Sequence, residues 1–427
     1  MENLPEEYIK PLYECFDLLK NNNLMFIEYP TGFRRYFSYL CAMPSLLLFY
    51  LSLSVYMVDL FSQKEVDIKE LIFVVPVYVV ITQTIFKAAI VYLNKNEIRS
   101  IIVELGEIWR STDLSDGQIK EKNVLLKSLN FCYKAFYWMN MIGSWQYMLL
   151  AVLETVFRRY IFQQECIFLL PFACYIPFAI EDCFTYLLVC VFEIYSMFRI
   201  IYFYLGTEFI MITLSSHLST EFVLLSYDLV HFNNFNFLNL NVIKLCNLIS
   251  NIMSVCISKY FRLTKKLDDI FNKMIFVNLT SATVTICFFG FSAKVAHGLL
   301  DMLKNIVPVA ALILPIYNLG YYAELLKESV SMCLIRSQKP CCLTILKLMP
   351  ITLRTFTTVS FILKEGISYT SHSTKLLSGT DSWWKYQTPA LNVLLRHPLY
   401  CSILILHLKN ISLFSFSYLA LSTYSYF

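Results

Sequence analysis

Long apolar runs recur along this chain of 427 residues, and their length constrains the fold more than any other feature. An α-helix needs about 20 mostly apolar residues to cross the roughly 30 Å of hydrocarbon in a bilayer. Segments richer in charged residues separate the runs. The predicted spans are Phe37–Leu60, Leu71–Leu93, Ala135–Leu153, Phe184–Thr213, Asn272–Ser292, Asn305–Tyr322 and Cys341–Ile362. The pattern therefore predicts an all-α, polytopic membrane protein built as a seven-transmembrane helix bundle.

The composition favours the same class. Hydrophobic residues make up 57% of the chain and charged residues 15%, against about 45–50% and about 25% in soluble proteins. The net charge of +4 is dispersed, so nucleic acid is not expected as a partner. The cysteines show neither a CxxC pair nor the spacing of a zinc site, and no metal or other cofactor is expected. Cys166, Cys174 and Cys183 lie in one loop, and a disulfide between two of them stays open.

Charged residues inside two predicted spans indicate what surrounds them. Lys87 lies near the end of the second span, where its long side chain is expected to reach the lipid headgroups. Glu193, Arg199 and Glu208 lie within the fourth span. Such residues normally face protein or water, because an ion in hydrocarbon is costly. The fourth helix is therefore expected to lie inside the bundle or to extend past the bilayer.

The segment between the fourth and fifth spans, Asn241–Phe271, is too polar for the bilayer but keeps an apolar stripe. Its apolar residues recur at spacings of three and four, which is typical of a helix with one buried face. We expect this helix to continue into the fifth span and to pack outside the membrane, as part of a helical anchor at about 214–273. A surface helix that merely connects two spans is the alternative.

Three segments resemble the insect odorant receptors, and they occur in the order found in that family. They are Phe192–Phe222, Asp268–Phe291 and Met332–Val359. The first has the family's Gly-x-Glu step and later His at Gly206, Glu208 and His217. The second is similar to the start of the fifth helix. The third contains RSQKP followed by LRTFTTV and resembles the last cytoplasmic loop and the pore helix.

The resemblance implies a topology, partners and residue roles. It implies a cytoplasmic N-terminus, the inverted topology, and a cation channel formed as a hetero-tetramer with a common co-receptor. The setting would be the plasma membrane of a sensory neuron dendrite, with membrane lipid around the helices and a small volatile odorant as the ligand. It implies structural roles for Glu208 and His217. It implies pore or gating roles for Arg354, Thr357, Thr358 and Val359.

Charge gives a weaker argument for the same orientation. Most Lys and Arg lie on the side of the N-terminus, but the loops on that side are also longer. The predicted organisation has five parts. They are the cytoplasmic N-terminus at 1–36, six helices with the pocket and the anchor at 37–322, a shortened cytoplasmic loop at 323–340, the seventh, pore helix at 341–362 and an atypical tail at 363–427.

Aromatic residues of five spans are candidates for the ligand pocket. In the implied orientation they lie at or above the middle of the membrane, and a cavity lined by aromatic rings with a few hydroxyls suits small volatile molecules. The candidates are Phe73, Tyr78, Trp145, Tyr147, Tyr186, Phe192, Phe288, Phe289 and Tyr317. The prediction concerns the group, because packing in the core explains any single one of them equally well.

The C-terminal third departs from the family pattern. Only Glu324–Ile335 separate the sixth helix from RSQKP, where the family has a longer stretch. Lys364, Glu365 and Gly366 interrupt the pore helix near its outer end. Two charges and a helix-weakening residue there predict weak conduction from this form of the chain. A skipped exon and a misread junction within 325–427 are our hypothesis for the difference.

Three other classes fit less well. A G-protein-coupled receptor needs an acidic-Arg step after its third span and an Asn-Pro-x-x-Tyr turn in its seventh, and neither is present. A gustatory receptor of the same superfamily needs Thr-Tyr and, after five apolar residues, Gln-Phe in its seventh helix, which is also missing. An enzyme or transporter finds no support, because neither a nucleophile arrangement, a phosphate loop nor an inverted repeat is visible.

Overall fold

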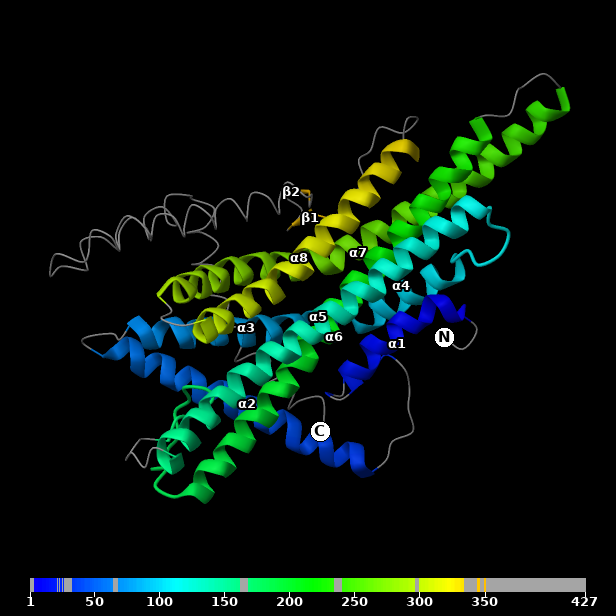
Figure 1. Ribbon diagram of the computed structural model, residues 1–427. Coiled ribbons are helices and arrows are strands. Elements are labelled where there is room, and N and C mark those ends of the chain that lie inside the picture. The colour runs from blue at the N-terminus through cyan, green and yellow to red at the C-terminus, as the bar shows by residue number, and fades with distance from the viewer. Residues whose placement is uncertain are drawn as a thin grey trace. The chain divides into compact units, whose positions relative to one another are not determined.

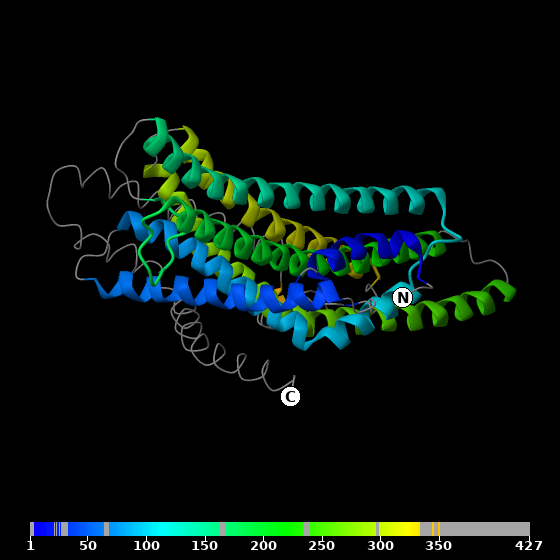
Figure 2. The ribbon, with the colours of Figure 1, turned by 90° about the horizontal axis from the view of Figure 1, so that it is seen from below.

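The computed structural model describes most of the helical part of the chain. The described residues are 4–20, 22, 24, 26, 33–63, 68–161, 168–233, 240–295, 299–333, 344–345 and 349–350. Nine helical segments and two short strands lie within them (Figures 1 and 2). Their bounds are α1 Glu6–Lys20, α2 Phe33–Ser62, α3 Ile68–Leu93, α4 Lys95–Glu107, α5 Asp116–Val156, the π-helix η1 Phe157–Ile161, α6 Cys183–Asn233, α7 Leu240–Val295, α8 Leu299–Cys333, β1 Thr344–Ile345 and β2 Met349–Pro350.

Five of the described helices are long and apolar enough to cross a membrane. Their apolar stretches are Met43–Ser62, Val74–Leu93, Cys183–Asp228, Ile257–Phe289 and Ile306–Ser329. They correspond to five of the seven predicted spans. The predicted third span lies wholly within the 41-residue helix α5, but Asn140, Ser144 and Gln146 make it less apolar than the other five.

The prediction of a seventh helix at 341–362 is wrong at the four residues of this range that the structure describes. Thr344 pairs with Pro350, and Ile345 with Met349, in a short antiparallel ladder. A helix is disfavoured at these positions, because Pro350 has no N–H and clashes inside a helix, and because Thr344 and Ile345 are β-branched. The rest of 341–362 and the tail at 363–427 lie outside the described residues.

Two helices extend far beyond the thickness of a bilayer. Helix α6 has 51 residues and α7 has 56, so at about 1.5 Å per residue each is more than twice the roughly 30 Å of a hydrocarbon core. The apolar stripe at Asn241–Phe271 lies in the first half of α7, which runs without a break into the predicted fifth span. The expectation of one continuous helix is confirmed.

Helix α6 is the centre of the bundle, because it contacts α1, α2, α3, α5, α7 and α8. The short N-terminal helix α1 packs directly on it (Figure 2). Gly206 permits this approach, since a Cβ atom at that position would lie 2.6 Å from the Leu19 side chain. Farther along α6, the ring nitrogen Nε2 of His217 lies 3.0 Å from the carbonyl oxygen of Tyr8. The segment expected as a cytoplasmic N-terminus is thus in part a component of the core.

Tyr8 joins α1 to α4 as well. Its hydroxyl donates a hydrogen bond of 2.7 Å to the carbonyl oxygen of Ile102. Burial raises the pKa of Tyr8 well above its ordinary value, and the carboxylate of Glu221 adds to the shift. The hydroxyl therefore stays protonated and remains a donor at physiological pH.

Candidate ligand pocket

A pocket of about 100 Å³ lies between the helices of the bundle. Helices α3, α5, α6, α7 and α8 contribute to its wall, together with one residue of the loop between η1 and α6. The lining residues are Pro76, Val77, Val80, Met139, Asn140, Gly143, Ser144, Tyr147, Phe172, Met197, Ile200, Ile201, Tyr204, Phe289, Pro308, Ala311 and Leu312. The wall is therefore mostly apolar, with a few polar groups on α5 and at Tyr204.

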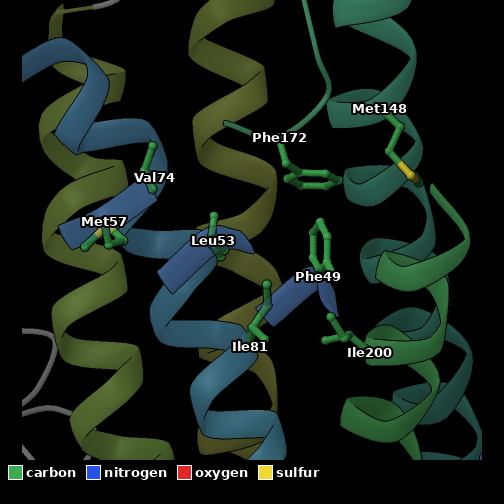
Figure 3. Close-up of a cluster of buried hydrophobic side chains, with 8 residues drawn as sticks. All are labelled: Phe49, Leu53, Met57, Val74, Ile81, Met148, Phe172 and Ile200. Carbon is green, nitrogen blue, oxygen red and sulfur yellow. The ribbon is translucent and has the colours of Figure 1, made fainter. Parts of the chain in front are cut away.

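Phe172 closes one side of the pocket from the loop. Its backbone N–H donates a hydrogen bond of 3.1 Å to Oε2 of Glu193, which is buried on α6. Its ring meets Phe49 of α2 edge-on, at 5.7 Å between centroids (Figure 3). Both belong to a buried cluster that joins α2, α3, α5 and α6, with Leu53, Met57, Val74, Ile81, Met148 and Ile200.

The rest of the loop is tied to the surrounding helices. Leu169 accepts a hydrogen bond of 2.9 Å from the hydroxyl of Tyr186 on α6, and its own N–H donates to Thr155 on α5. The carbonyl oxygen of Tyr175 accepts a 2.5 Å hydrogen bond from Ser52 on α2. Cys174 of this loop is a free thiol, and Cys166 lies outside the described residues.

Two of the aromatic candidates line this pocket. Tyr147 of α5 and Phe289 of α7 both belong to its wall, with their ring centroids 6.3 Å apart. Tyr78 and Phe192 do not line it but pack against the adjacent hydrophobic cluster. Tyr78 stacks there on Tyr50, with 5.7 Å between ring centroids and an interplanar angle of 9°.

The other candidates lie elsewhere. Tyr186 is engaged with the loop, as described above. Trp145 and Tyr317 are 44% and 42% exposed and do not belong to the pocket wall, and the ring of Trp145 packs edge-on against Phe198 of α6. Phe288 is half-buried, but it is not part of the pocket wall. The side chain of Phe73 lies outside the described residues, as do the predicted pore residues Arg354, Thr357, Thr358 and Val359.

Two aromatic residues of the wall, Phe172 and Tyr204, were not among the candidates, and the other residues that the prediction missed are small, aliphatic or weakly polar. On α5 they include Asn140, Gly143 and Ser144, which precede Tyr147 by seven, four and three residues. These spacings place all four on one helix face. A stripe of small and polar residues leading to an aromatic residue was thus the signal in the sequence. The contributions of α8, such as Ala311, had no comparable signal.

A buried polar network lies next to the pocket. Lys87 of α3 and Glu208 of α6 form an ion pair, and both side chains are fully buried. Nδ2 of Asn278 donates a 3.1 Å hydrogen bond to the second carboxylate oxygen of Glu208, and Gln83 donates a 2.7 Å hydrogen bond to Oδ1 of Asn278. The ammonium of Lys87 also lies 4.5 Å from the ring centroid of Tyr204, which lines the pocket.

This network corrects one expectation and explains another. Lys87 does not extend to the lipid headgroups, because Glu208 and Tyr204 give its charge a partner inside the protein. Glu208 faces protein, as its cost in hydrocarbon requires. His217 is also fully buried, and its ring packs against those of Tyr8 and Trp109, at 4.8 Å from each. These surroundings fit a structural role for His217, because α1, α6 and the α4–α5 connection meet at its ring.

Comparison with known proteins assigns the chain to a family. Residues 67–332 match the family model described as the 7tm odorant receptor. The structure is similar to that of the insect olfactory receptor OR5 from Machilis hrabei, with a TM-score of 0.66, 13% sequence identity, and coverage of 84% of this chain and 98% of the other. OR5 in complex with eugenol gives a TM-score of 0.64 at 13% identity, with 84% and 97% covered.

No curated protein sequence matches the chain. The family match ends at residue 332, so RSQKP at 336–340 lies beyond it. At 13% identity the two solved structures show the fold, which is the all-helical, seven-helix fold of these receptors. The family match covers well over half of the chain. The chain is a multi-pass membrane protein that belongs to the insect odorant receptor family.

Proposed function

We propose that this receptor binds a small, mostly apolar odorant in the pocket between α3, α5, α6, α7 and α8. Binding would open a cation channel that the chain forms with a common co-receptor, as a hetero-tetramer in the plasma membrane of a sensory neuron dendrite. The observation that carries the proposal is the pocket itself, since its wall is mostly apolar and contains few polar groups. That is the usual character of a small-molecule site.

The size of the pocket supports a small ligand. Its volume is about 100 Å³, whereas pockets for drug-sized ligands have about 300–1,000 Å³. Eugenol, which is bound to the similar receptor OR5, is a small phenol with a methoxy and an allyl substituent. The ligand of the present chain would be of that size or smaller, or the wall would move outward to admit it. Tyr204 lies beside the Lys87–Glu208 pair, so it would transmit the effect of ligand binding to α3 and α6.

The proposed orientation places the N-terminus in the cytoplasm. The family resemblance and the raw number of Lys and Arg on that side support it. The extensions of α6 and α7 would then form the cytoplasmic anchor, and the pocket would lie in the outer part of the bundle. An epitope tag at Met1 should bind antibody only after the cells are permeabilised. Staining of intact cells would contradict this orientation.

Two neighbouring alanines of α8 offer a direct test of the pocket. Ala311 lines the pocket, whereas Ala310 does not. Ala311→Phe should fill part of the cavity and weaken binding of volatile ligands at least tenfold, because ring and ligand cannot occupy the same space. Ala310→Phe, the matched control, should leave binding within about twofold. Ligand-induced stabilisation of the purified full chain against heat is the measurement, since a ligand that binds the folded state raises the unfolding temperature.

Equal binding by both variants would place the ligand site elsewhere.

Odorant-evoked cation current, in cells that also express the co-receptor, tests the channel half of the proposal. Because of the shortened loop and of Lys364, Glu365 and Gly366, the current from this chain is expected to be weak. It should recover when a family-like loop is restored and residues 360–427 are replaced by a short Ser/Tyr-rich helix end. Strong current from the unchanged chain would contradict that expectation.

A further inference from the structure

Phe172 is the one residue of the described pocket wall that does not belong to a helix. The other residues of the wall are held by the backbone hydrogen bonds of α3, α5, α6, α7 and α8. A loop residue lacks that support, so its backbone groups need partners elsewhere. The position of this part of the wall is therefore set by the partners of Phe172.

The loop is attached to the helices on either side of Phe172. Three residues before it, Leu169 is hydrogen-bonded to side chains of α5 and α6. Three residues after it, Tyr175 exchanges two hydrogen bonds with Ser52 of α2. Because both attachments are independent of Phe172, the loop would stay in place if Phe172 lost a contact of its own.

Glu193 supplies the acceptor that the Phe172 N–H needs. Its Oε2 accepts a hydrogen bond of 3.1 Å from that N–H, and the Phe172 carbonyl oxygen accepts one of 3.0 Å from the N–H of Cys174. Glu193 is 1% exposed and Phe172 is 4% exposed, so bulk water does not reach this bond. A buried N–H without an acceptor is costly. Without the Glu193 carboxylate, Phe172 should therefore shift, and its ring should move with it.

The carboxylate ties the ring to the helix that forms another part of the wall. Met197 and Ile201 line the pocket and follow Glu193 by four and eight residues, so all three lie on one face of α6. The Phe172 ring also packs edge-on against Phe49 of α2 (Figure 3). The hydrogen bond to Glu193 thus fixes how far the ring stands from the α6 part of the wall.

We propose that Glu193 is a positioning residue that holds the Phe172 ring in the pocket wall and so sets the upper size limit of the ligand. The inference rests on the proposed function, because it needs the ligand to occupy this pocket. It deepens that function by identifying the part of the wall that limits the length of the ligand and the residue that keeps it there.

A series of methyl ketones from 2-butanone to 2-undecanone tests the size limit. Each ketone is titrated against the purified full chain in lipid nanodiscs, and its dissociation constant is obtained from the rise in unfolding temperature. For each ketone, the constant of a variant is divided by that of the native chain. Partition of the ketone into lipid cancels in this ratio, because the lipid is the same in both measurements.

Glu193→Leu should weaken binding of the short ketones, which an enlarged pocket contacts less, and strengthen binding of the long ones. The variant-to-native ratio should fall at least tenfold along the series, since a buried methylene contributes roughly fourfold in affinity and the shifted ring makes room for two or more. Phe172→Ala should change the ratio in the same direction. Glu193→Gln should reproduce the native series, because an amide oxygen also accepts a hydrogen bond from an N–H.

Tyr186→Phe is the matched control. It removes a hydrogen bond of 2.9 Å from the same loop, at Leu169, but leaves the bond between Phe172 and Glu193 in place. Its ratio should be the same for every ketone. If Glu193→Leu does not fold, Glu193→Ala provides the same comparison, since alanine also lacks an acceptor and is the best helix former.

The possible failures are distinguishable. If the ratio for Glu193→Leu is constant along the series while Ala311→Phe weakens binding, the pocket is the ligand site but the inference about Glu193 is wrong. A change with Glu193→Gln as large as that with Glu193→Leu also overturns the inference, because the acceptor would then not be the cause. If Ala311→Phe changes the binding of no ketone, the pocket is not the site, and both proposals fall together.

Discussion

Lys87→Met is expected to lower the free energy of unfolding by about 3–5 kcal/mol, the usual cost of removing one partner from a buried ion pair. Both side chains of the Lys87–Glu208 pair are 0% exposed. Without the ammonium, the hydrogen bond from Asn278 is the one that the described part of the chain still offers the carboxylate of Glu208. That single neutral donor cannot replace a full positive charge. Glu208→Leu should be damaging for the converse reason, because it leaves the Lys87 ammonium buried without its carboxylate.

The double variant Lys87→Met/Glu208→Leu separates charge from packing. Replacing a whole buried ion pair by apolar residues of similar volume is often neutral or stabilising, so the double variant should be more stable than either single variant. Thermal unfolding of the purified chain measures this, and biotinylation at the cell surface measures delivery. Lys327→Met is the control, because Lys327 is 52% exposed in its pair with Glu324 and should contribute at most about 1 kcal/mol. Additive losses in the double variant would contradict the pairing.

Arg110→Ala is expected to lower the free energy of unfolding by about 3 kcal/mol. The change removes the residue that joins the α4–α5 connection to the end of α6. The Nε of Arg110 donates to Oε2 of Glu221 at 3.1 Å, and its two terminal nitrogens donate to Asp228 at 2.5 Å and to the carbonyl oxygen of Glu221 at 3.1 Å. The Glu221 side chain is 0% exposed. In the variant it would keep the hydrogen bonds from the Tyr260 hydroxyl at 3.0 Å and from the backbone N–H of residue 110 at 3.1 Å, but it would lose its neutralising charge.

Arg110→Lys should recover only part of this loss. A lysine keeps the positive charge but lacks the planar fork that contacts two carboxylates and a carbonyl group at once. Unfolding temperature and the hydrogen-exchange rates of the α4–α5 connection are the measurements. Arg262→Ala provides the matched control, because Arg262 is 61% exposed in its pair with Glu104 and should matter little. If Arg110→Ala and Arg262→Ala behaved alike, the assigned role of Arg110 would be wrong.

Much of the fold was predictable because transmembrane helices are local structures. A run of about 20 apolar residues satisfies its backbone hydrogen bonds within itself, so most spans could be placed without knowledge of their neighbours. The apolar stripe at Asn241–Phe271 predicted the continuous helix α7 for the same reason. Prediction failed at Thr344–Ile345 and Met349–Pro350, where an apolar run contains a proline and pairs with itself as strands.

The sequence predicted a pocket lined in part by aromatic residues, but it did not predict most of the residues that line it. Its aromatic content follows from the sequence at Tyr147 and Phe289, but its remaining wall depends on which helix faces meet. Trp145 is only two residues from Tyr147 and does not line the pocket. Successive residues of a helix differ by about 100° in direction, so the residue type alone does not say which of two neighbouring aromatic residues lines a cavity.

The sequence by itself determined the class of the protein, most of its helices and the kind of environment that Glu208 requires. Glu208 in an apolar run had to face protein, because hydrocarbon cannot solvate a carboxylate. Only the tertiary structure decided its partner, since Lys87 lies 121 residues earlier and reaches it through the packing of α3 against α6. The same holds for Arg110 and Glu221, and for the approach of α1 to Gly206. A local sequence pattern shows that a buried charge requires a partner. The identity of that partner depends on contacts between segments that are distant in the chain.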